Sequence, residues 1–435
     1  MKKFYLLLIF FIAHFFEAQN LNDKKPNFVI IVTDDQDAKT LNAYGDQSCD
    51  TPEIDKISKK GMTFDSAYHM GSYRAAVCTP SRIMLMTGRY LWETKGFNVN
   101  YPPLNYVHKV AENYTKISPV NPAYFSLPAI FKRNGYYTFR TSKRGNSYEG
   151  ANLLFEERYD KKNREADQEN GSKWHADKVI EYLEKRKTKH ETQPFLIYLG
   201  FSHPHDPRHG KPELLKKYGA IDPGPPDIVN KRAPKLPINY LPKHPFPIGH
   251  PDLRDKNAVE GVLQRRDEVT IRNERGKEFA VIEEIDNQIG RVIKRLKSSG
   301  ELDNTYIIFT SDHGYHLGEH GHWQKQTLFE KSTRVPLIFS GPGIPRGISS
   351  KSPVELIDIY PTLTDLTKIE TPSHVVGKSL VPIFRNNDFK VRESALTRWR
   401  ASQHNAVFEG FSIKTSRYRI TKWGDNGEDG FELYD

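Results

Sequence analysis

Three short apolar runs, each followed by acidic or histidine residues, stand out along the chain. They span residues 27–33 (NFVIIVT), 195–201 (FLIYLGF) and 306–310 (YIIFT). Nearly all-apolar runs of this length are typical of strands buried on both faces of a parallel sheet. Segments 175–186 and 278–296 carry apolar residues at helical spacing, with charged residues on the opposite face. The pattern predicts an α/β fold with a mostly parallel central sheet flanked by helices.

The pattern changes toward the end of the chain. Residues 411–423 (FSIKTSRYRITKW) alternate like half-exposed strands, and a turn rich in Gly, Asp and Asn leads to a last strand signal at 431–433. We therefore divide the chain into an α/β domain at 25–380 and a smaller antiparallel subdomain at 381–435. Residues 210–251 are rich in Pro, Lys and Asp and show no clear period, so we expect a surface insertion there, near the functional site.

The first residues have the order of an export signal. Lys2 and Lys3 precede an apolar run at 4–16, and Ala18 offers a small residue for cleavage. A membrane anchor is the alternative, but the run is shorter than the ~20 residues that span a bilayer. We predict a signal peptide at 1–18, export to the periplasm or the medium, and no stable membrane anchor.

Composition and charge exclude a disordered chain and indicate the kind of partner that the protein binds. Aromatic residues make up 12% of the chain, far more than a disordered chain carries, so a packed globular protein is expected. A net charge of +10 favours a polyanionic partner, and both nucleic acids and sulfated glycans are polyanions. Charge alone does not choose between them. The basic residues are scattered and no nucleic-acid-binding motif is present, so we predict no nucleic-acid partner.

Acidic residues and histidines follow the apolar runs. In chain order they are Asp34, Asp35, His203, His205, Asp312 and His313. The carboxyl ends of parallel strands meet at one edge of a sheet, where sites are built. Crowded carboxylates raise one another's pKa values, and a bound divalent cation relieves that repulsion. An oxygen-rich set with His313 as one nitrogen ligand favours Ca²⁺ or Mg²⁺, although an Asp after a strand also commonly caps the next helix.

The chain has two cysteines, Cys49 and Cys78, so no disulfide framework holds the fold. A bond between the two is one interpretation, and a small buried thiol at Cys78 is another. The residues after Cys78 (TPSR) predict the start of a helix, which places Cys78 at its positive end with Arg82 one turn on. That setting suits an anionic nucleophile or an anionic substrate.

These motifs resemble those of the sulfatase family. Residues 78–82 (CTPSR) with 87–89 (TGR) match the family signature, in which the cysteine is oxidised to formylglycine after translation. Residues 26–35 look like the first strand and metal pair of the family, and 311–314 (SDHG) with 318–321 (GEHG) resemble the second metal half-site.

Further segments extend the resemblance along the chain. Residues 135–138 (GYYT) with Lys143 resemble the second signature, and His313 together with Pro204–His205 is most similar to the iduronate-2-sulfatase branch. Residues 432–435 (ELYD) are similar to a C-terminal motif that normally continues, so we expect the natural domain to be longer.

The resemblance implies an alkaline-phosphatase-like fold and a sulfuric ester hydrolase. It implies a Ca²⁺ site, with Mg²⁺ as the alternative, formed by Asp34, Asp35, Cys78, Asp312 and His313. It implies the catalytic residues Cys78 (as formylglycine), Arg82, Lys143, His205 and Lys325, with His205 as the general acid. It also implies a formylglycine-generating maturation enzyme as a partner, and a sulfated carbohydrate such as ulvan or a glycosaminoglycan as the substrate, cut from the chain end.

The sequence departs from the family at one point. A histidine normally follows the lysine of the second signature by two or three residues, and here Gly145 and Asn146 stand in those places. We expect His175 or His203 to take over its role. These two and Arg208 are also candidate substrate-binding residues, since spare basic groups can pair with a uronate.

Two other functions stay open from the sequence. Formylglycine phosphodiesterases and phosphonate hydrolases share the cysteine signature, although no second set of metal ligands is evident. A non-catalytic protein that binds sulfated glycans also fits the basic charge and the metal site.

Overall fold

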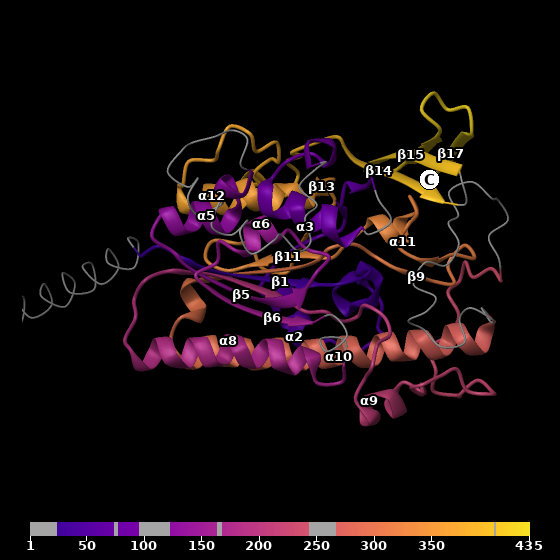
Figure 1. Ribbon diagram of the computed structural model, residues 1–435, viewed down its shortest axis with the longest axis horizontal. Helices are drawn as coiled ribbons and strands as arrows, with labels where there is room; N and C mark the ends of the chain where they lie inside the picture. Colours follow the sequence, from indigo (N-terminus) through magenta and orange to yellow (C-terminus); the bar gives the residue numbers. More distant parts are fainter. Residues whose placement is uncertain (1–23, 74–76, 95–121, 163–167, 243–266, 404–405) are drawn as a thin grey trace, which may run out of the picture.

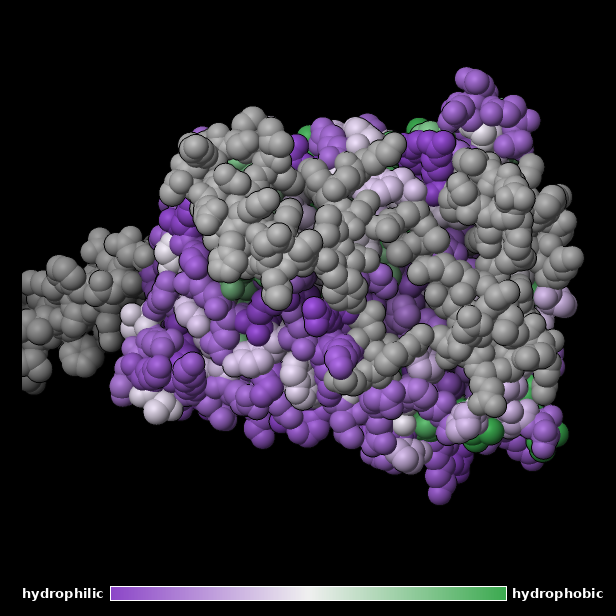
Figure 2. Space-filling model, in the orientation of Figure 1, coloured by the Kyte–Doolittle hydropathy of each residue, from purple (hydrophilic) through white to green (hydrophobic). Residues whose placement is uncertain are grey.

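The computed structural model describes residues 24–73, 77–94, 122–162, 168–242, 267–403 and 406–435. The predicted signal peptide at 1–18 lies outside these residues. No helix in the described part of the chain combines the length and the apolar character needed to cross a membrane. The described surface is largely hydrophilic on the face shown in Figure 2, with small hydrophobic patches.

The three predicted apolar runs form adjacent strands at the centre of an eight-stranded sheet. They are β1 (Asn27–Thr33), β7 (Phe195–Gly200) and β8 (Thr305–Ser311), in the order β8-β1-β7. Both pairings are parallel, so the three strands end at one edge. Every residue of the three strands is buried, because layers of helices cover both faces of the sheet.

The rest of the main sheet extends on both sides in the order β12-β2-β11-β8-β1-β7-β5-β6. β11 runs antiparallel to its neighbours β8 and β2, and the other pairings are parallel, which confirms the mostly parallel sheet. The additional strands are β2 (Gly61–Phe64), β5 (Tyr137–Arg144), β6 (Glu157–Lys162), β11 (Leu337–Ser340) and β12 (Ile348–Ser350).

One layer of helices covers the face of the sheet that carries Val29 and Ile31. It consists of α2 (Pro52–Lys59), α8 (Gly171–Thr188) and α10 (Glu268–Ser298), and Figure 1 shows α8 and α10 lying along the sheet. The helices expected at 175–186 and 278–296 are therefore present but longer. The first turns of α10 bury paired charged side chains, including Glu274 and Lys277. These turns therefore show no apolar stripe in the sequence.

A second layer covers the opposite face, which carries Phe28, Ile30 and Val32. The longer helices there are α3 (Cys78–Thr87), α5 (Leu127–Arg133), α12 (Ile359–Thr367) and α13 (Val381–Arg385). The short elements of the chain are β3 (Ala67–Tyr68), α6 (Glu149–Asn152), α9 (Pro212–Lys217), β9 (His316–Leu317), β10 (Trp323–Gln324), α11 (Glu330–Thr333) and β13 (Val354–Glu355). In the described part of the expected insertion, only α9 is regular.

A five-stranded sheet closes the C-terminal end of the chain, in the order β17-β16-β15-β14-β4. Four of its strands form the expected antiparallel unit, and they are β14 (Ser394–Gln403), β15 (Ala406–Thr415), β16 (Arg419–Trp423) and β17 (Gly430–Tyr434). The fifth, β4 (Gly71–Ser72), comes from the N-terminal part and pairs in parallel with β14. The subdomain is therefore joined to the segment that leads into α3.

Asp286 of α10 caps the start of α2 from outside that helix. The N-cap residue Thr51 makes no side-chain hydrogen bond to the helix, and Pro52 has no amide hydrogen. The carboxylate of Asp286 accepts the amide of Glu53 at 3.0 Å and the amide of Ile54 at 2.7 Å. These are the two amides that a capping side chain normally satisfies.

We expect Asp286→Ala to lower the free energy of unfolding by about 2 kcal/mol, because it leaves two helix amides without their acceptor. Denaturant titration measures this loss. The exposed Asn287→Ala on the same helix is the control and should change stability by less than about 0.5 kcal/mol. Equal effects of the two substitutions would contradict the capping role.

Candidate active site

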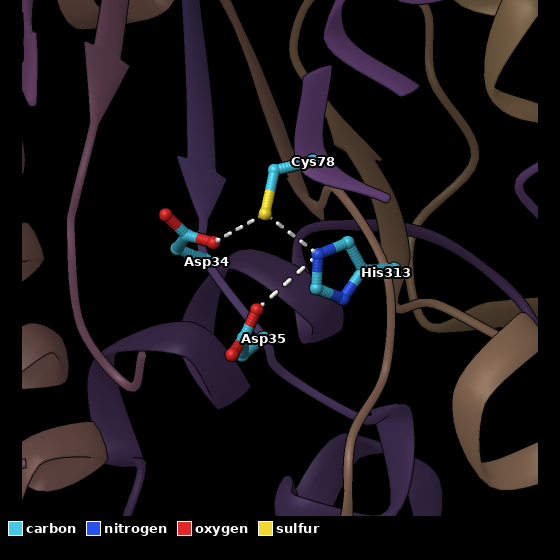
Figure 3. Close-up of side chains that lie close together, drawn as sticks. All are labelled: Asp34, Asp35, Cys78 and His313. Atoms are coloured by element: carbon cyan, nitrogen blue, oxygen red, sulfur yellow. Dashed lines mark hydrogen bonds and ion pairs between the residues drawn. The ribbon is translucent and has the colours of Figure 1, made fainter. Parts of the chain in front are cut away.

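The side chains that follow the central strands gather around Cys78. Asp34 and Asp35 follow β1, and Asp312 and His313 follow β8, whose last residue Ser311 pairs with Thr33. Cys78 is the first residue of α3. Ligand atoms of Asp34, Asp35, Cys78 and His313 all lie within 4.8 Å of one another, and all four residues are buried (Figure 3).

A change of backbone direction lets two consecutive acids face one centre. Along a strand, successive side chains point to opposite faces. Asp35 leaves that conformation with φ 71°, in the left-handed region that non-glycine residues rarely adopt. Asp34 Oδ1 then lies 3.5 Å from Cys78 Sγ, while Asp35 Oδ1 lies 3.2 Å from His313 Nε2. The strained backbone at Asp35 is typical of a functional site.

His313 offers one ring nitrogen to this centre. Its Nδ1 lies 2.9 Å from the carbonyl oxygen of Gly314, so the hydrogen-bond pattern assigns the ring proton to Nδ1. Nε2 then presents a lone pair, 3.1 Å from Cys78 Sγ. A histidine fixed in this way by a backbone carbonyl is typical of a metal ligand.

Three buried cations balance the acids. Arg82 bridges two of them, with Nη2 3.0 Å from Asp34 Oδ2 and Nε 3.0 Å from Asp312 Oδ2. Lys143 at the end of β5 contacts Asp34. Lys325 Nζ lies 2.7 Å from Asp35 Oδ1 and 3.5 Å from Cys78 Sγ. The cations can therefore also reach an anion bound beside Cys78.

The ionisation of the site follows from burial and these charges. Burial opposes ionisation of Asp34, but Lys143 and Arg82 hold the pKa of its carboxyl well below the usual value. Burial raises the pKa of Asp35, and Lys325 and His313 offset only part of that rise. Burial also raises the pKa of the Cys78 thiol well above its usual value, despite the nearby Lys325. The unmodified thiol is therefore protonated and a poor nucleophile.

The arrangement fits a hard divalent cation. Asp35 Oδ2 is buried and accepts no hydrogen bond from the residues that the structure describes. Carboxylate oxygens dominate the donor set, with one imidazole nitrogen, and this composition favours Ca²⁺ or Mg²⁺ over zinc. Asp312 belongs to the same group, since its Oδ1 lies 3.5 Å from His313 Nε2.

His205 also reaches the site. Its Nε2 lies 3.9 Å from Asp35 Oδ2, and its Nδ1 lies 2.7 Å from the carbonyl oxygen of Asp206. Burial, with Lys143 and Lys325, lowers the pKa of this imidazole well below its usual value. The structure thus brings together the predicted residues Asp34, Asp35, Cys78, Arg82, Lys143, His205, Asp312, His313 and Lys325.

The side chains of the three candidate substrate-binding residues contact groups other than Cys78, although the carbonyl of His203 accepts the amide of Asp34 at 3.3 Å. His175 on α8 is buried, with Nδ1 2.8 Å from Thr141 Oγ1, and burial lowers its pKa to about 3. His203 Nδ1 lies 3.2 Å from Ser172 Oγ. The guanidinium of the buried Arg208 lies 4.6 Å from the centre of the Tyr315 ring. Among the described contacts, none places the side chain of His175 or Arg208 against Cys78, so their direct roles stay predictions.

Asp206 was missed by the sequence analysis. Ligand atoms of Asp35, His205 and Asp206 lie within 4.8 Å of one another. The signal was present, since an acidic residue directly follows the histidine assigned as the general acid. An Asp next to Pro is also typical of a turn, so the local pattern alone does not assign it to a site.

Two family models together match residues 26–435 of the chain. The family model described as Sulfatase matches residues 26–369, and the one described as N-sulphoglucosamine sulphohydrolase, C-terminal, matches residues 318–435. A sulfatase of Formosa agariphila is 27% identical over 94% of this chain and 81% of its own length. Human iduronate 2-sulfatase is 27% identical over 93% of this chain and 86% of its own length.

Solved structures agree on the fold. A structure described as a 2-O GAG sulfatase aligns with a TM-score of 0.71 and 22% identity, covering 95% of this chain and 85% of the other. A phosphonate monoester hydrolase from Silicibacter pomeroyi aligns with a TM-score of 0.69 and 18% identity, covering 94% and 89%. At this identity the likeness shows the fold alone, which is the alkaline-phosphatase-like α/β arrangement that the sequence predicted.

We expect Ca²⁺ or Mg²⁺ to raise the melting temperature of the protein, because a ligand that binds only the folded state adds about 2.7 kcal/mol at a hundredfold excess over Kd. Asp35→Asn should lose this increase, as it removes a charged oxygen ligand. The control is Asp303→Asn, an exposed acid just before the opposite end of β8. Equal metal-induced shifts in the parent and in Asp35→Asn would argue against the site.

Proposed function

This chain belongs to the sulfatase family, and from that premise we propose that it hydrolyses sulfate esters of a sulfated carbohydrate with formylglycine at position 78. The observation that carries the proposal is the buried position of Cys78, with Asp34, His313 and Lys325 within 3.5 Å of its sulfur. A thiol with only a structural role does not need a carboxylate, an imidazole and an ammonium group around its sulfur.

The chemistry of residue 78 supports oxidation. The thiol of Cys78 is protonated and buried, so as a cysteine it attacks poorly. The hydrate of formylglycine carries two hydroxyls on one carbon, and the sulfur of Cys78 stands in for one of these oxygens. We propose that a maturation enzyme carries out the oxidation.

We propose that Asp34, Asp35, Asp312, His313 and residue 78 hold the metal, with Ca²⁺ as the first choice and Mg²⁺ as the alternative. When bound, the metal supplies positive charge that favours loss of a proton from the hydrate and balances the charge of the sulfate.

Different residues of the chain carry out different parts of the reaction. Arg82, Lys143 and Lys325 surround the position where sulfate oxygens would lie and stabilise the charge that spreads over them. A hydrate hydroxyl gives its proton to water and attacks the sulfur, the bond from sulfur to the sugar oxygen breaks, and that oxygen takes a proton from the protonated form of His205. The low pKa of His205 makes this form a strong proton donor, and the ring then takes up a new proton from water. The products of this first step are the free alcohol and a sulfate ester on residue 78.

The second step restores the enzyme. The remaining hydroxyl of residue 78 gives up its proton, the carbon–oxygen bond to sulfate breaks, and the aldehyde forms again. Water then adds to the aldehyde and regenerates the hydrate. We keep His203 and His175 as the two candidates that accept the proton, in place of the histidine absent at Gly145 and Asn146.

The substrate class rests on charge and on relatives. The net charge of +10 favours a polyanion. Iduronate 2-sulfatase is among the curated relatives, and one solved neighbour is described in complex with D-glucosamine-2-N,6-O-disulfate. We propose a uronate-bearing sulfated polysaccharide, such as ulvan or a glycosaminoglycan, attacked at the chain end. Export to the periplasm or the medium is consistent with a substrate of this size.

Sulfate release from defined sulfated oligosaccharides tests the function. We expect release by the parent and a loss of at least about 10⁴-fold in Cys78→Ala, because the nucleophile is gone. Cys49→Ala is the matched control, since Cys49 is the other buried cysteine and packs in the core on the α10 side. Mass analysis of the peptide with residue 78 should show the lower mass of formylglycine.

Two results would contradict the proposal. An unmodified thiol together with no sulfate release would favour the non-catalytic binder of sulfated glycans. Faster turnover of nitrophenyl phosphate than of nitrophenyl sulfate would favour the phosphodiesterase or phosphonate hydrolase.

A further inference from the structure

The edge of the main sheet opposite the active site collects the ends of four helices. β1, β5, β7 and β8 run in parallel and therefore begin at this edge, and β2 runs in the same direction as β8 across the antiparallel β11. The helices α2, α5, α8 and α10 each lead into one of these strands, so they end at the same edge. Each carries lysine or arginine in its last turn. Basic residues that are scattered along the sequence thus come together in space.

The ends of α8 and α10 are in contact. Lys187 Nζ donates to the carbonyl of Ser298 at 3.2 Å. Four exposed lysines lie on these two helix ends, and they are Lys185, Lys189, Lys294 and Lys297. Within the described residues their ammonium groups form no ion pair. The carboxylate of Glu301, which follows α10, is bound by Arg186 instead, with 2.7 Å between Oε1 and Nε.

A cavity extends this basic surface toward α2. Its volume is about 470 Å³, within the usual range of ligand pockets, and α2, α10 and the start of β8 contribute to its lining. The exposed cations Lys60 and Arg346 line it. Among the lining acids, Glu53 pairs with Lys56 at 2.6 Å, and Asp303 is the other. A cavity with two exposed cations in its wall suits an anionic group.

Compensation of helix dipoles accounts for only part of this charge. Cations in the last turn of a helix stabilise its negative end. Lys24 and Arg346 lie outside the helices, however, and Lys294 precedes the last turn of α10. Exposed acids, such as Glu184 and Glu191, are fewer at this edge than exposed cations. The edge therefore keeps an excess of positive charge that attracts polyanions.

This edge is separate from the active site. β1 and β8 have seven residues each, so roughly 20 Å of strand lies between the two edges. Buried cations of the site, such as Arg82 and Lys325, face Asp34 and Asp35 at the other edge. A single sulfated sugar cannot occupy both places. A polysaccharide carries many sulfate groups, so one part of it can bind here while another part, or a neighbouring chain, enters the active site.

The basic edge consists of six exposed cations, which are Lys60, Lys185, Lys189, Lys294, Lys297 and Arg346. We propose that it is a second binding surface for the sulfated polysaccharide, separate from the active site. The choice of ligand rests on the proposed function, because it takes the ligand to be the polymer whose sulfate esters the enzyme hydrolyses. Binding here holds the enzyme on the polymer and raises the concentration of sulfate esters around the active site. Flexible lysine side chains impose no fixed geometry, so the surface accepts an irregularly sulfated chain.

Charge removal tests the basic edge. Lys185→Gln, Lys189→Gln, Lys294→Gln and Lys297→Gln are combined on Cys78→Ala, so that binding is measured without turnover. We expect the affinity for heparin, the sulfated polysaccharide used as the probe, to fall at least about tenfold at ~0.15 M salt, because four ammonium groups are lost. Isothermal titration calorimetry measures this loss. Replacement of the same four lysines by arginine keeps the charge and should retain the affinity within about threefold.

A second set of substitutions controls for net charge. Lys216→Gln, Lys231→Gln, Lys351→Gln and Lys390→Gln remove the same charge from exposed positions that are not part of the basic edge. This set should change the affinity for heparin by less than about twofold, because salt screens distant charges. Both glutamine sets should melt within a few degrees of the parent, since exposed lysines contribute little to stability.

In the enzyme with Cys78 intact, the basic edge should affect KM and not kcat. On a long sulfated polysaccharide that the enzyme desulfates, the four glutamines at the basic edge should raise KM by at least about fivefold and leave kcat within about twofold, because binding far from the reacting atoms does not lower the barrier. A sulfated disaccharide is too short to reach the basic edge from the active site and should give unchanged constants.

Several results would overturn the inference. Equal losses of heparin affinity in the two glutamine sets would assign the binding to net charge, and tighter binding of the parent to duplex DNA or to anionic phospholipid vesicles would assign the edge to another class of partner. An unchanged KM on the polymer would remove its link to the substrate. Heparin binding that depends on the basic edge, in a matured enzyme that releases no sulfate from any sulfated sugar, would overturn the proposed function and leave the binding surface standing.

Discussion

The site exists only because mutual repulsion among three buried carboxylates is balanced. Asp34, Asp35 and Asp312 lie together at an edge of the sheet with at most 1% of their surface exposed. Repulsion between like charges is many times stronger there than in water. Arg82, Lys143 and Lys325 supply three compensating charges, each from a different part of the chain. The helix α3, the strand β5 and the loop before α11 must all be in place before the acids can coexist.

Much of this arrangement could be predicted from local patterns. The runs at β1, β7 and β8 are apolar because helices cover both faces of these strands, and that constraint is visible in the sequence itself. The same pattern predicts that the acids at the ends of these strands lie close together, since parallel strands bring their ends to one edge of the sheet. The start of α3 at Cys78 was likewise predictable from the residues that follow it.

The features that escaped prediction depend on contacts between distant segments. The first turns of α10 are buried by ion pairs such as Lys277 with Asp222, so they lack the apolar stripe that marks a helix in sequence. The surroundings of Arg208 follow from the packing of Tyr315 and Glu274, which no local pattern reveals. Asp206 comes close to Asp35 only when the segment after β7 folds back toward β1. In each case the information lies in tertiary packing and not in periodicity.

The pairing of β4 with β14 makes the end of the chain a structural support of the site. Thr397 Oγ1 donates to the carbonyl of His69 at 2.9 Å, in the segment that leads to Cys78. Arg419 of β16 donates to the carbonyl of Leu328 at 3.2 Å, in the loop that carries Lys325, and to Thr333 Oγ1 at 3.0 Å, at the end of α11. During synthesis, roughly 300 residues separate Cys78 from these strands, which corresponds to about 15–60 s of translation. For that interval the segment around residue 78 lacks the strands that later close its surroundings, and this is the window in which the proposed maturation enzyme would act.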